Sequence, residues 1–82
     1  MDGRRWTLSF RDAAGFIVDV EVLRQTLAGR PGIVSVGDAD VDGFDVRTDR
    51  LRRADEMAAR WLDAIVAAHR AYARGKGIEL PY

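Results

Sequence analysis

The sequence predicts an α+β domain in which a four-stranded antiparallel sheet, built from two hairpins in the order ββαββα, carries one long C-terminal helix on one face. Three observations support this prediction: a turn signal between alternating apolar residues at 6–22, an Asp-Gly pair at 42–43 between two β-like segments, and helical spacing of apolar residues after residue 49. With 82 residues, the chain has room for one domain, which we place at residues 1–82.

The first hairpin is expected at residues 6–22, because Asp12 and Gly15 stand at the first and fourth positions of a type I turn. Pairing around this turn puts apolar residues opposite one another on one face, for example Leu8 opposite Val20, and polar residues on the other face. Such a hairpin buries one face and leaves the other in water.

The same region also fits a helix that begins at Asp12, since four apolar residues recur there at helical spacing: Phe16, Val20, Leu23 and Leu27. The β-branched side chains at 17–22 favour the strand. The alternative arrangement is similar to the ferredoxin-like fold, βαββα with or without a last strand. In the favoured arrangement, residues 23–28 form a short connecting helix that Gly29 ends.

The second hairpin is expected from strands near residues 33–41 and 44–48, joined by the Asp-Gly pair at 42–43, which is the strongest short hairpin signal in a sequence. The apolar residues change parity along the first of these strands, from even numbers before residue 37 to odd numbers after residue 38. A one-residue insertion has this effect, so we expect a β-bulge at residues 37–38.

Residues 49–74 are expected to form one long helix with Asp49 as its N-cap and Gly75 as its stop. Its apolar stripe should face the sheet, with Trp61 meeting Trp6 across the interface. The stripe consists of Leu51, Ala54, Ala58, Trp61, Ile65, Ala68 and Tyr72. The last residues, 78–82, are expected to add an edge strand or to remain irregular.

The predicted helix is longer than the sheet beneath it. At 1.5 Å per residue it would extend about 37 Å, whereas a seven-residue strand covers about 23 Å, so roughly 14 Å of apolar stripe would overhang the sheet. Because closed two-fold dimers are the commonest soluble oligomers, we expect a second copy of the chain to cover this end. The candidate contact residues there are Ile65, His69 and Tyr72.

An acidic segment, residues 38–49, resembles the calcium-binding loop of EF-hand and dockerin proteins. The matching positions are the first, third, fifth, sixth and twelfth: Asp38, Asp40, Asp42, Gly43 and Asp49. The sequence departs from that pattern at the eighth position, where Asp45 replaces an apolar residue, and it shows no entering helix. The other interpretation is an ordinary hairpin with solvated acids, so we assign no metal and no cofactor. In that hairpin Asp40 lies opposite Asp45, and such a like-charge pair favours a cation or a basic partner.

The net charge is zero, from 13 basic and 13 acidic residues, but the charges are unevenly distributed. Residues 12–49 are mainly acidic, and an arginine cluster is expected near the start of the long helix: Arg4, Arg5, Arg47, Arg50, Arg52 and Arg53. This cluster makes a nucleic-acid-binding regulator an alternative function. The zero net charge and the acidic segment disfavour nucleic acid as the partner.

The residues that most enzyme chemistry needs are missing from the sequence. There is no cysteine for a disulfide, a thiolate metal site or a nucleophile, and His69 is the only histidine. Ser9 and Ser35 lie outside known nucleophile motifs, and the glycines form no phosphate-binding loop. We therefore expect no catalytic residues, and a cytoplasmic protein without a membrane span.

The leading functional hypothesis is a small non-enzymatic protein–protein interaction module of the inhibitor, immunity-protein or accessory-subunit type, homodimeric through its long helix. Asp40, Asp42 and Asp45 are expected to meet a basic partner protein. The alternatives are a nucleic-acid-binding regulator that uses the arginine cluster and a calcium-binding adaptor that uses residues 38–49.

Overall fold

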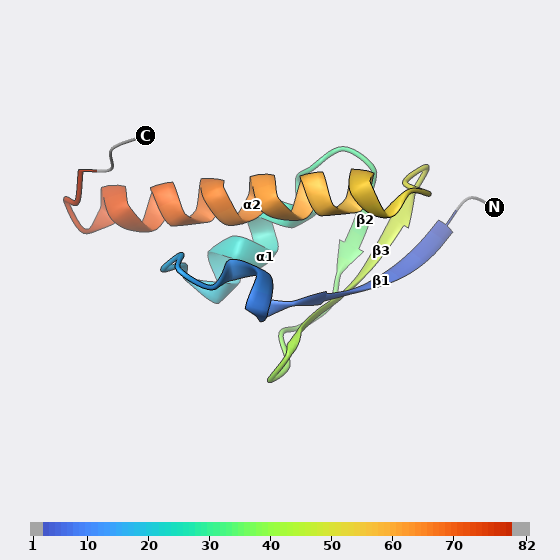
Figure 1. The fold of residues 1–82 in the computed structure, drawn as a ribbon, viewed down its shortest axis with the longest axis horizontal. Coiled ribbons are helices and arrows are strands. Elements are labelled where there is room, and N and C mark those ends of the chain that lie inside the picture. The colour runs from blue at the N-terminus through green and yellow to red at the C-terminus, as the bar shows by residue number, and fades with distance from the viewer. Residues whose placement is uncertain (1–2, 80–82) are drawn as a thin grey trace.

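The computed structural model describes residues 3–79 of the chain. Its elements follow one another as strand β1 (Gly3–Ser9), the 3-10 helix η1 (Phe10–Ala13), helix α1 (Val20–Ala28), strands β2 (Ile33–Val36) and β3 (Gly43–Asp49), and helix α2 (Ala54–Gly75) (Figure 1). The described strands form one antiparallel sheet in the order β1-β3-β2. The α+β class is correct, whereas the predicted four-stranded sheet is wrong because the sheet has three strands.

The missing strand is the second half of the predicted first hairpin, residues 16–22. β1 pairs with β3, from Gly3 opposite Asp49 to Ser9 opposite Gly43, and α1 begins at Val20 instead. The resulting order is βαββα, which is the order of elements in the alternative arrangement.

Two features stabilise a helix where β-branched residues predicted a strand. The carboxylate of Asp19 caps α1 by accepting the backbone N–H groups of Glu21, at 3.0 Å, and Val22, at 3.1 Å. Leu23 and Leu27 lie on one face of α1 and are completely buried. Burying two leucines contributes several kcal/mol, more than the small penalty of valine in a helix. α1 is therefore part of the core, not only a connection.

The second hairpin is confirmed as a β2–β3 pair, but its details differ from the prediction. β2 ends at Val36, which lies opposite Val46, and residues 37–42 form a loop. The irregular pairing falls between Ile33 and Ser35, not at residues 37–38. The glycine of the Asp-Gly pair also allows β3 to approach β1 closely, because a Cβ at Gly43 would lie 1.7 Å from the carbonyl oxygen of Leu8 in β1.

α2 begins later than predicted because Asp49 belongs to β3, where it pairs with Gly3. Arg50 then adopts a left-handed backbone conformation, with φ of 67°, and the chain reverses before the helix. The N-cap is Arg53, whose side chain makes no capping hydrogen bond. The helix ends at Gly75, one residue beyond the predicted end.

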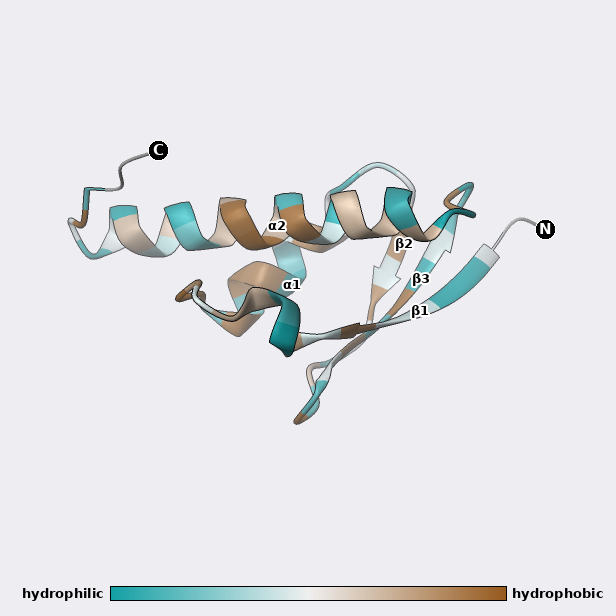
Figure 2. Ribbon diagram, viewed as in Figure 1, coloured by the Kyte–Doolittle hydropathy of each residue, from teal (hydrophilic) through white to brown (hydrophobic). Residues whose placement is uncertain are grey.

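α2 lies along the whole molecule and rests on two supports (Figure 1). Its first half covers the sheet, where Trp61 contacts Phe44 edge to face with ring centroids 6.0 Å apart. Its second half covers α1 and the segment after β1, and Figure 2 shows the hydrophobic stretches of these elements beneath the helix. The predicted meeting of the two tryptophans is wrong: Trp6 donates to the Thr48 hydroxyl at 2.7 Å, and Trp61 donates to the Asp12 carboxylate at 3.0 Å.

The overhanging part of α2 is covered by the chain itself. The helix has 22 residues, or about 33 Å. Beyond the sheet, Ile65 is 0% exposed and Ala68 is 1% exposed, since both belong to the same core cluster as Leu23 and Leu27. The length of the helix therefore gives no reason for a second copy at this end. None of the helices in residues 3–79 has the length and hydropathy that a membrane span requires.

Candidate protein-interaction surface

The six residues predicted to make contacts lie in two separate regions. Asp40 and Asp42 are exposed in the loop 37–42, and Asp45 is exposed on β3. On α2, Ile65 is buried, while His69 and Tyr72 are partly buried. In the structure, the three acidic residues lie apart from the helix residues. The three acidic residues do not meet at one point either.

The acidic loop uses one of its carboxylates to hold its own shape. The Oδ1 atom of Asp40 accepts the backbone N–H groups of Asp42, at 2.8 Å, and Gly43, at 2.9 Å. These two hydrogen bonds lower the pKa of the Asp40 carboxyl below the usual aspartate value. Its neighbour Val41 is 94% exposed, so the tip of the loop is accessible to solvent.

The predicted pairing of Asp40 with Asp45 is wrong. On the β2 side of β3, the Gly37 N–H donates to the Asp45 carbonyl at 2.8 Å and the Asp40 N–H donates to the Gly43 carbonyl at 3.0 Å, so Asp40 does not lie opposite Asp45. On the β1 side, the Thr7 hydroxyl donates to the Oδ1 atom of Asp45 at 3.3 Å. The segment from residue 43 to residue 49 is extended, so the twelfth position of the calcium-loop pattern, Asp49, lies in a strand. Within residues 3–79 no three Asp, Glu, His or Cys side chains are close enough to hold a metal ion together.

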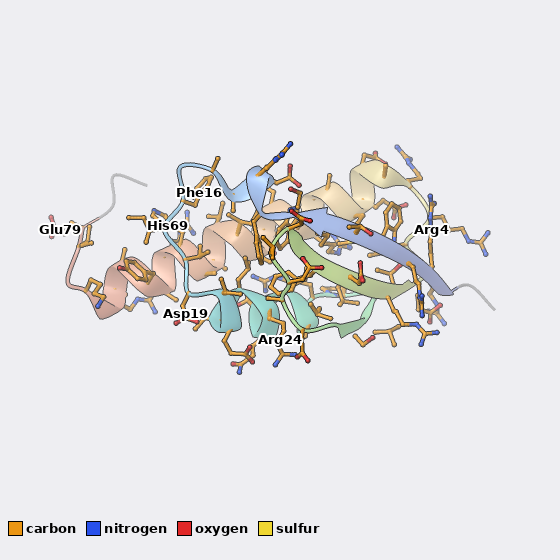
Figure 3. All side chains as sticks on the ribbon, turned by 90° about the horizontal axis from the view of Figure 1, so that it is seen from below. Arg4, Phe16, Asp19, Arg24, His69 and Glu79 are labelled. Atoms are coloured by element: carbon orange, nitrogen blue, oxygen red, sulfur yellow. The ribbon has the colours of Figure 1, made fainter. Side chains whose placement is uncertain are left out.

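His69 and Tyr72 help to fix the far end of the molecule. The His69 Nδ1 atom lies 3.0 Å from the carbonyl oxygen of Ile17 and donates to it, and the imidazole packs against Phe16 with ring centroids 5.3 Å apart (Figure 3). Tyr72 lies beneath the ammonium group of Lys76, 5.7 Å from the ring centroid. The His69 contacts join α2 to the segment that precedes α1, whereas the contact between Tyr72 and Lys76 lies at the C-terminal end of α2 itself.

The arginine cluster lies at the opposite end of the molecule from His69, where β1 begins and β3 ends (Figure 3). Several of its members are engaged: the Arg4 guanidinium stacks on Trp6 at 4.1 Å and donates to the carbonyl of Arg52, and Arg53 pairs with Asp55 at 2.6 Å. The cluster is thus partly neutralised and partly held by the fold.

Two arginines of the cluster lie directly opposite each other on the outer face of the sheet. Arg5 of β1 pairs in register with Arg47 of β3, and Ser35 of β2 lies on the other side of Arg47. Among residues 3–79, neither Arg5 nor Arg47 forms an ion pair. Both arginines line an open depression of about 210 Å³, together with Ser35, Gly37, Asp45 and Val46. Like charges in directly opposite positions destabilise a sheet unless an anion lies near them.

β1 is also an edge strand with an unpaired side, a feature that the sequence analysis did not identify. In the described sheet its one neighbour is β3. The Phe10 N–H donates to the carbonyl of Asp42 at 2.8 Å, so even-numbered residues of this segment bond to β3. Because backbone groups alternate along a strand, the N–H and C=O groups of Gly3, Arg5, Thr7 and Ser9 point away from the sheet.

The flank of α2 above this edge carries one large exposed apolar side chain, Leu62. Arg60 donates to the carbonyl of Pro31 at 3.1 Å, which identifies the flank of α2 on the β2 side. His69 identifies the other flank, because it contacts the segment that follows β1. Leu62 lies two turns before His69 on this same face and is 54% exposed. The free edge of β1 and an apolar helix flank therefore lie on one side of the molecule.

Comparison of the chain with protein-family models, curated proteins and solved structures gives no match. The function is therefore inferred from the geometry of this surface.

Proposed function

We propose that the protein is a small non-enzymatic module that binds another protein by adding an extended segment of that protein to the free edge of β1. The observation that carries the proposal is a regular seven-residue edge strand whose outward backbone groups are unpaired in the described sheet, beside the exposed side chain of Leu62. Strand addition supplies affinity through main-chain hydrogen bonds and specificity through alternate side chains.

The non-enzymatic part of the proposal is supported by the way in which the chain uses its reactive groups. His69, the only histidine, donates to a backbone carbonyl and packs on Phe16. The Asp12 carboxylate accepts the indole N–H of Trp61, and Asp40 holds the acidic loop. Each of these side chains has a structural partner.

A homodimer through α2 stays a separate proposal and needs a different contact from the one predicted. Ile65 is buried within the chain, whereas Leu62 is exposed and available to a second helix. Sedimentation velocity over a concentration series tests this proposal. At concentrations at which the native chain associates, a Leu62→Gln variant is expected to remain monomeric. A native chain that stays monomeric at high concentration contradicts this proposal.

The edge proposal is tested by removing one outward backbone N–H. Thr7→Pro removes the N–H of Thr7, which points away from β3, so the β1–β3 ladder keeps all its hydrogen bonds. Thr7→Ala is the matched control, because it loses the same hydroxyl and keeps the N–H. A displayed library of short random segments is selected against the native chain, and the enriched segments are then measured on both variants.

We expect the enriched segments to bind the native chain and Thr7→Ala alike and to lose binding to Thr7→Pro. Thermal unfolding of the two variants establishes that both are folded. Segments that bind Thr7→Pro as well as the native chain, or a selection that enriches none, would contradict strand addition at β1.

A further inference from the structure

We infer that the segment received by the β1 edge alternates acidic and apolar residues, with its acidic side chains on the outer face of the sheet. This inference rests on the proposed function and names the chemical class of its partner. It follows from the side chains that an added strand would meet on its two faces, since successive residues of a strand point to opposite sides of a sheet.

On the outer face, the added strand would lie beside Arg5 and Thr7. Arg5 and Arg47 form a like-charge pair with no ion-pair partner among residues 3–79. The nearby carboxylate of Asp45 accepts the Thr7 hydroxyl and makes no ion pair with either arginine. A carboxylate beside Arg5 would receive charge-assisted hydrogen bonds and relieve the repulsion between the two guanidinium groups.

On the helix side, the added strand would lie beside Trp6 and Leu8 and beneath the flank of α2. Trp6 is partly buried, and the Arg4 guanidinium covers one face of its ring. Leu62 contributes apolar surface that is exposed to water in the described chain. Apolar side chains at alternate positions of the segment would bury this surface, which favours binding by about 25 cal/mol per Å².

The charges of β1 favour an acidic partner over a second β1. Antiparallel pairing of β1 with its copy would place Arg4 and Arg5 of both chains along one shared edge, and β1 contains no acidic residue to neutralise them. Positively charged residues on an edge strand are a known protection against such self-pairing. The same residues attract an acidic segment, so charge selects the class of partner.

The probe for this inference is a synthetic peptide as long as β1 that alternates glutamate and valine, with both ends blocked. The comparison peptides replace every glutamate by glutamine or by lysine. Binding to the native chain at low salt is followed by calorimetry and by the fluorescence of Trp6 in a Trp61→Phe chain. We expect the glutamate peptide to bind about ten-fold more tightly than the glutamine peptide, as one charge-assisted hydrogen bond supplies. The lysine peptide is expected to be weakest.

Two variants that remove the same charge test whether Arg5 causes the preference. Arg5→Gln should bring the affinities of the glutamate and glutamine peptides to within about two-fold, because the ion pair is then absent. Arg74→Gln, an exposed position at the far end of α2, should leave the ten-fold ratio unchanged. Methylation of the peptide nitrogens that face β1 should abolish binding, since it removes donors to the edge.

Failure of this inference differs from failure of the proposed function. If the glutamate, glutamine and lysine peptides bind equally and all lose binding to Thr7→Pro, the edge is the site and the acidic class is overturned. If the native chain dimerises and Thr7→Pro prevents the dimer, the edge receives a second copy of the chain and the acidic segment is likewise overturned. If no peptide binds and the library selection enriches nothing, the proposed function itself is overturned.

Discussion

The two edges of the sheet differ in how well they are covered. β2 has four residues and irregular pairing, and the Arg24 guanidinium of α1 approaches the outward carbonyl of Val36 at 3.5 Å. β1 has seven residues in unbroken register with β3, and no described element pairs with its outer side. Short length, irregularity and a cover are the usual means by which proteins protect a sheet edge from other strands.

The difference indicates that the β2 edge is closed to an added strand and that the β1 edge accepts some strands and not others. β2 has all three protections, whereas β1 has only its charged residues, Arg4 and Arg5. Charge excludes positively charged or identical strands but does not exclude acidic ones. Three substitutions test this difference between β1 and β2.

Gly43→Ala is expected to have the largest effect, because it separates β1 from β3. The new Cβ would lie 1.7 Å from the Leu8 carbonyl oxygen and 2.8 Å from its carbon, which are backbone atoms that cannot rotate away. We expect the free energy of unfolding to fall by about 4 kcal/mol, measured by urea denaturation.

The control for this change is Gly75→Ala at the end of α2, where a Cβ would meet no atom within 4 Å. It should leave stability unchanged or raise it by about 0.5 kcal/mol, because alanine favours a helix. Equal stabilities of Gly43→Ala and the native chain would show that β1 is not held at this point.

Thr48→Val is expected to have an intermediate effect, because it weakens the anchoring of β1. The Thr48 hydroxyl is buried, accepts the Trp6 indole N–H at 2.7 Å and donates to the Arg4 carbonyl at 3.4 Å. Valine leaves the indole without this partner, so we expect a loss of about 1 kcal/mol in thermal unfolding. Thr7→Val, which removes an exposed hydroxyl, should change stability by less than about 0.5 kcal/mol. A Thr48→Val chain as stable as Thr7→Val would contradict this role.

The smallest effect is expected from the ion pair between Glu21 and Arg24, because Arg24 is the side chain that covers the outer side of β2. Arg24 donates through Nε to Glu21 at 3.0 Å and through Nη2 to its other carboxylate oxygen, and these bonds lower the pKa of the Glu21 carboxyl. A depressed pKa in the folded state adds stability above the pKa of the unfolded chain. That stability is lost as the pH falls through the folded value. The contribution is therefore present at neutral pH and disappears in acid.

NMR titration of the Glu21 carboxyl should give a pKa below the usual glutamate value, and Arg24→Gln should raise it toward that value. Gln25 also donates to Glu21 and is left unchanged, so that any difference in the pKa of Glu21 between the two chains comes from Arg24. An unshifted pKa in the native chain would mean that Arg24 does not hold this position in solution. If the segments selected against the native chain also bind at β2 in the Arg24→Gln variant, the Arg24 side chain is the feature that distinguishes the β2 edge from the β1 edge.

Local patterns predicted the parts of the fold that depend on neighbouring residues. The long helix follows from its apolar spacing and from Gly75, and the β2–β3 hairpin follows from two β-like segments around residues 42–43. The predicted start of α2 was wrong because Asp49 pairs with Gly3 and therefore belongs to β3. A helix-capping pattern in the sequence does not reveal this pairing.

The first hairpin could not be predicted correctly because the outcome depends on distant residues. The alternating residues of β1 match both residues 16–22 and β3, and the local turn signal favoured the nearer partner. Leu23 and Leu27 are buried beneath α2, so their helix is selected by a contact between elements that lie far apart in the sequence.

The candidate surface was only partly visible in the sequence. The arginine cluster was predicted from charge, but the direct opposition of Arg5 and Arg47 depends on the β1–β3 register. The free edge has no sequence signal of its own, because it results from the absence of a pairing partner for β1 in the described sheet. The acidic residues were visible, although the tie of Asp40 to its own loop was not.

The long separation between β1 and β3 also has a consequence for the newly made chain. Paired residues are at least 34 positions apart, since Ser9 lies opposite Gly43, whereas Val36 and Val46 of the other pair are 10 apart. At usual rates of translation, β1 would leave the ribosome roughly 2–7 s before its partner strand. Through that interval β1 has no pairing partner, and its two arginines would disfavour pairing with the identical strand of another chain.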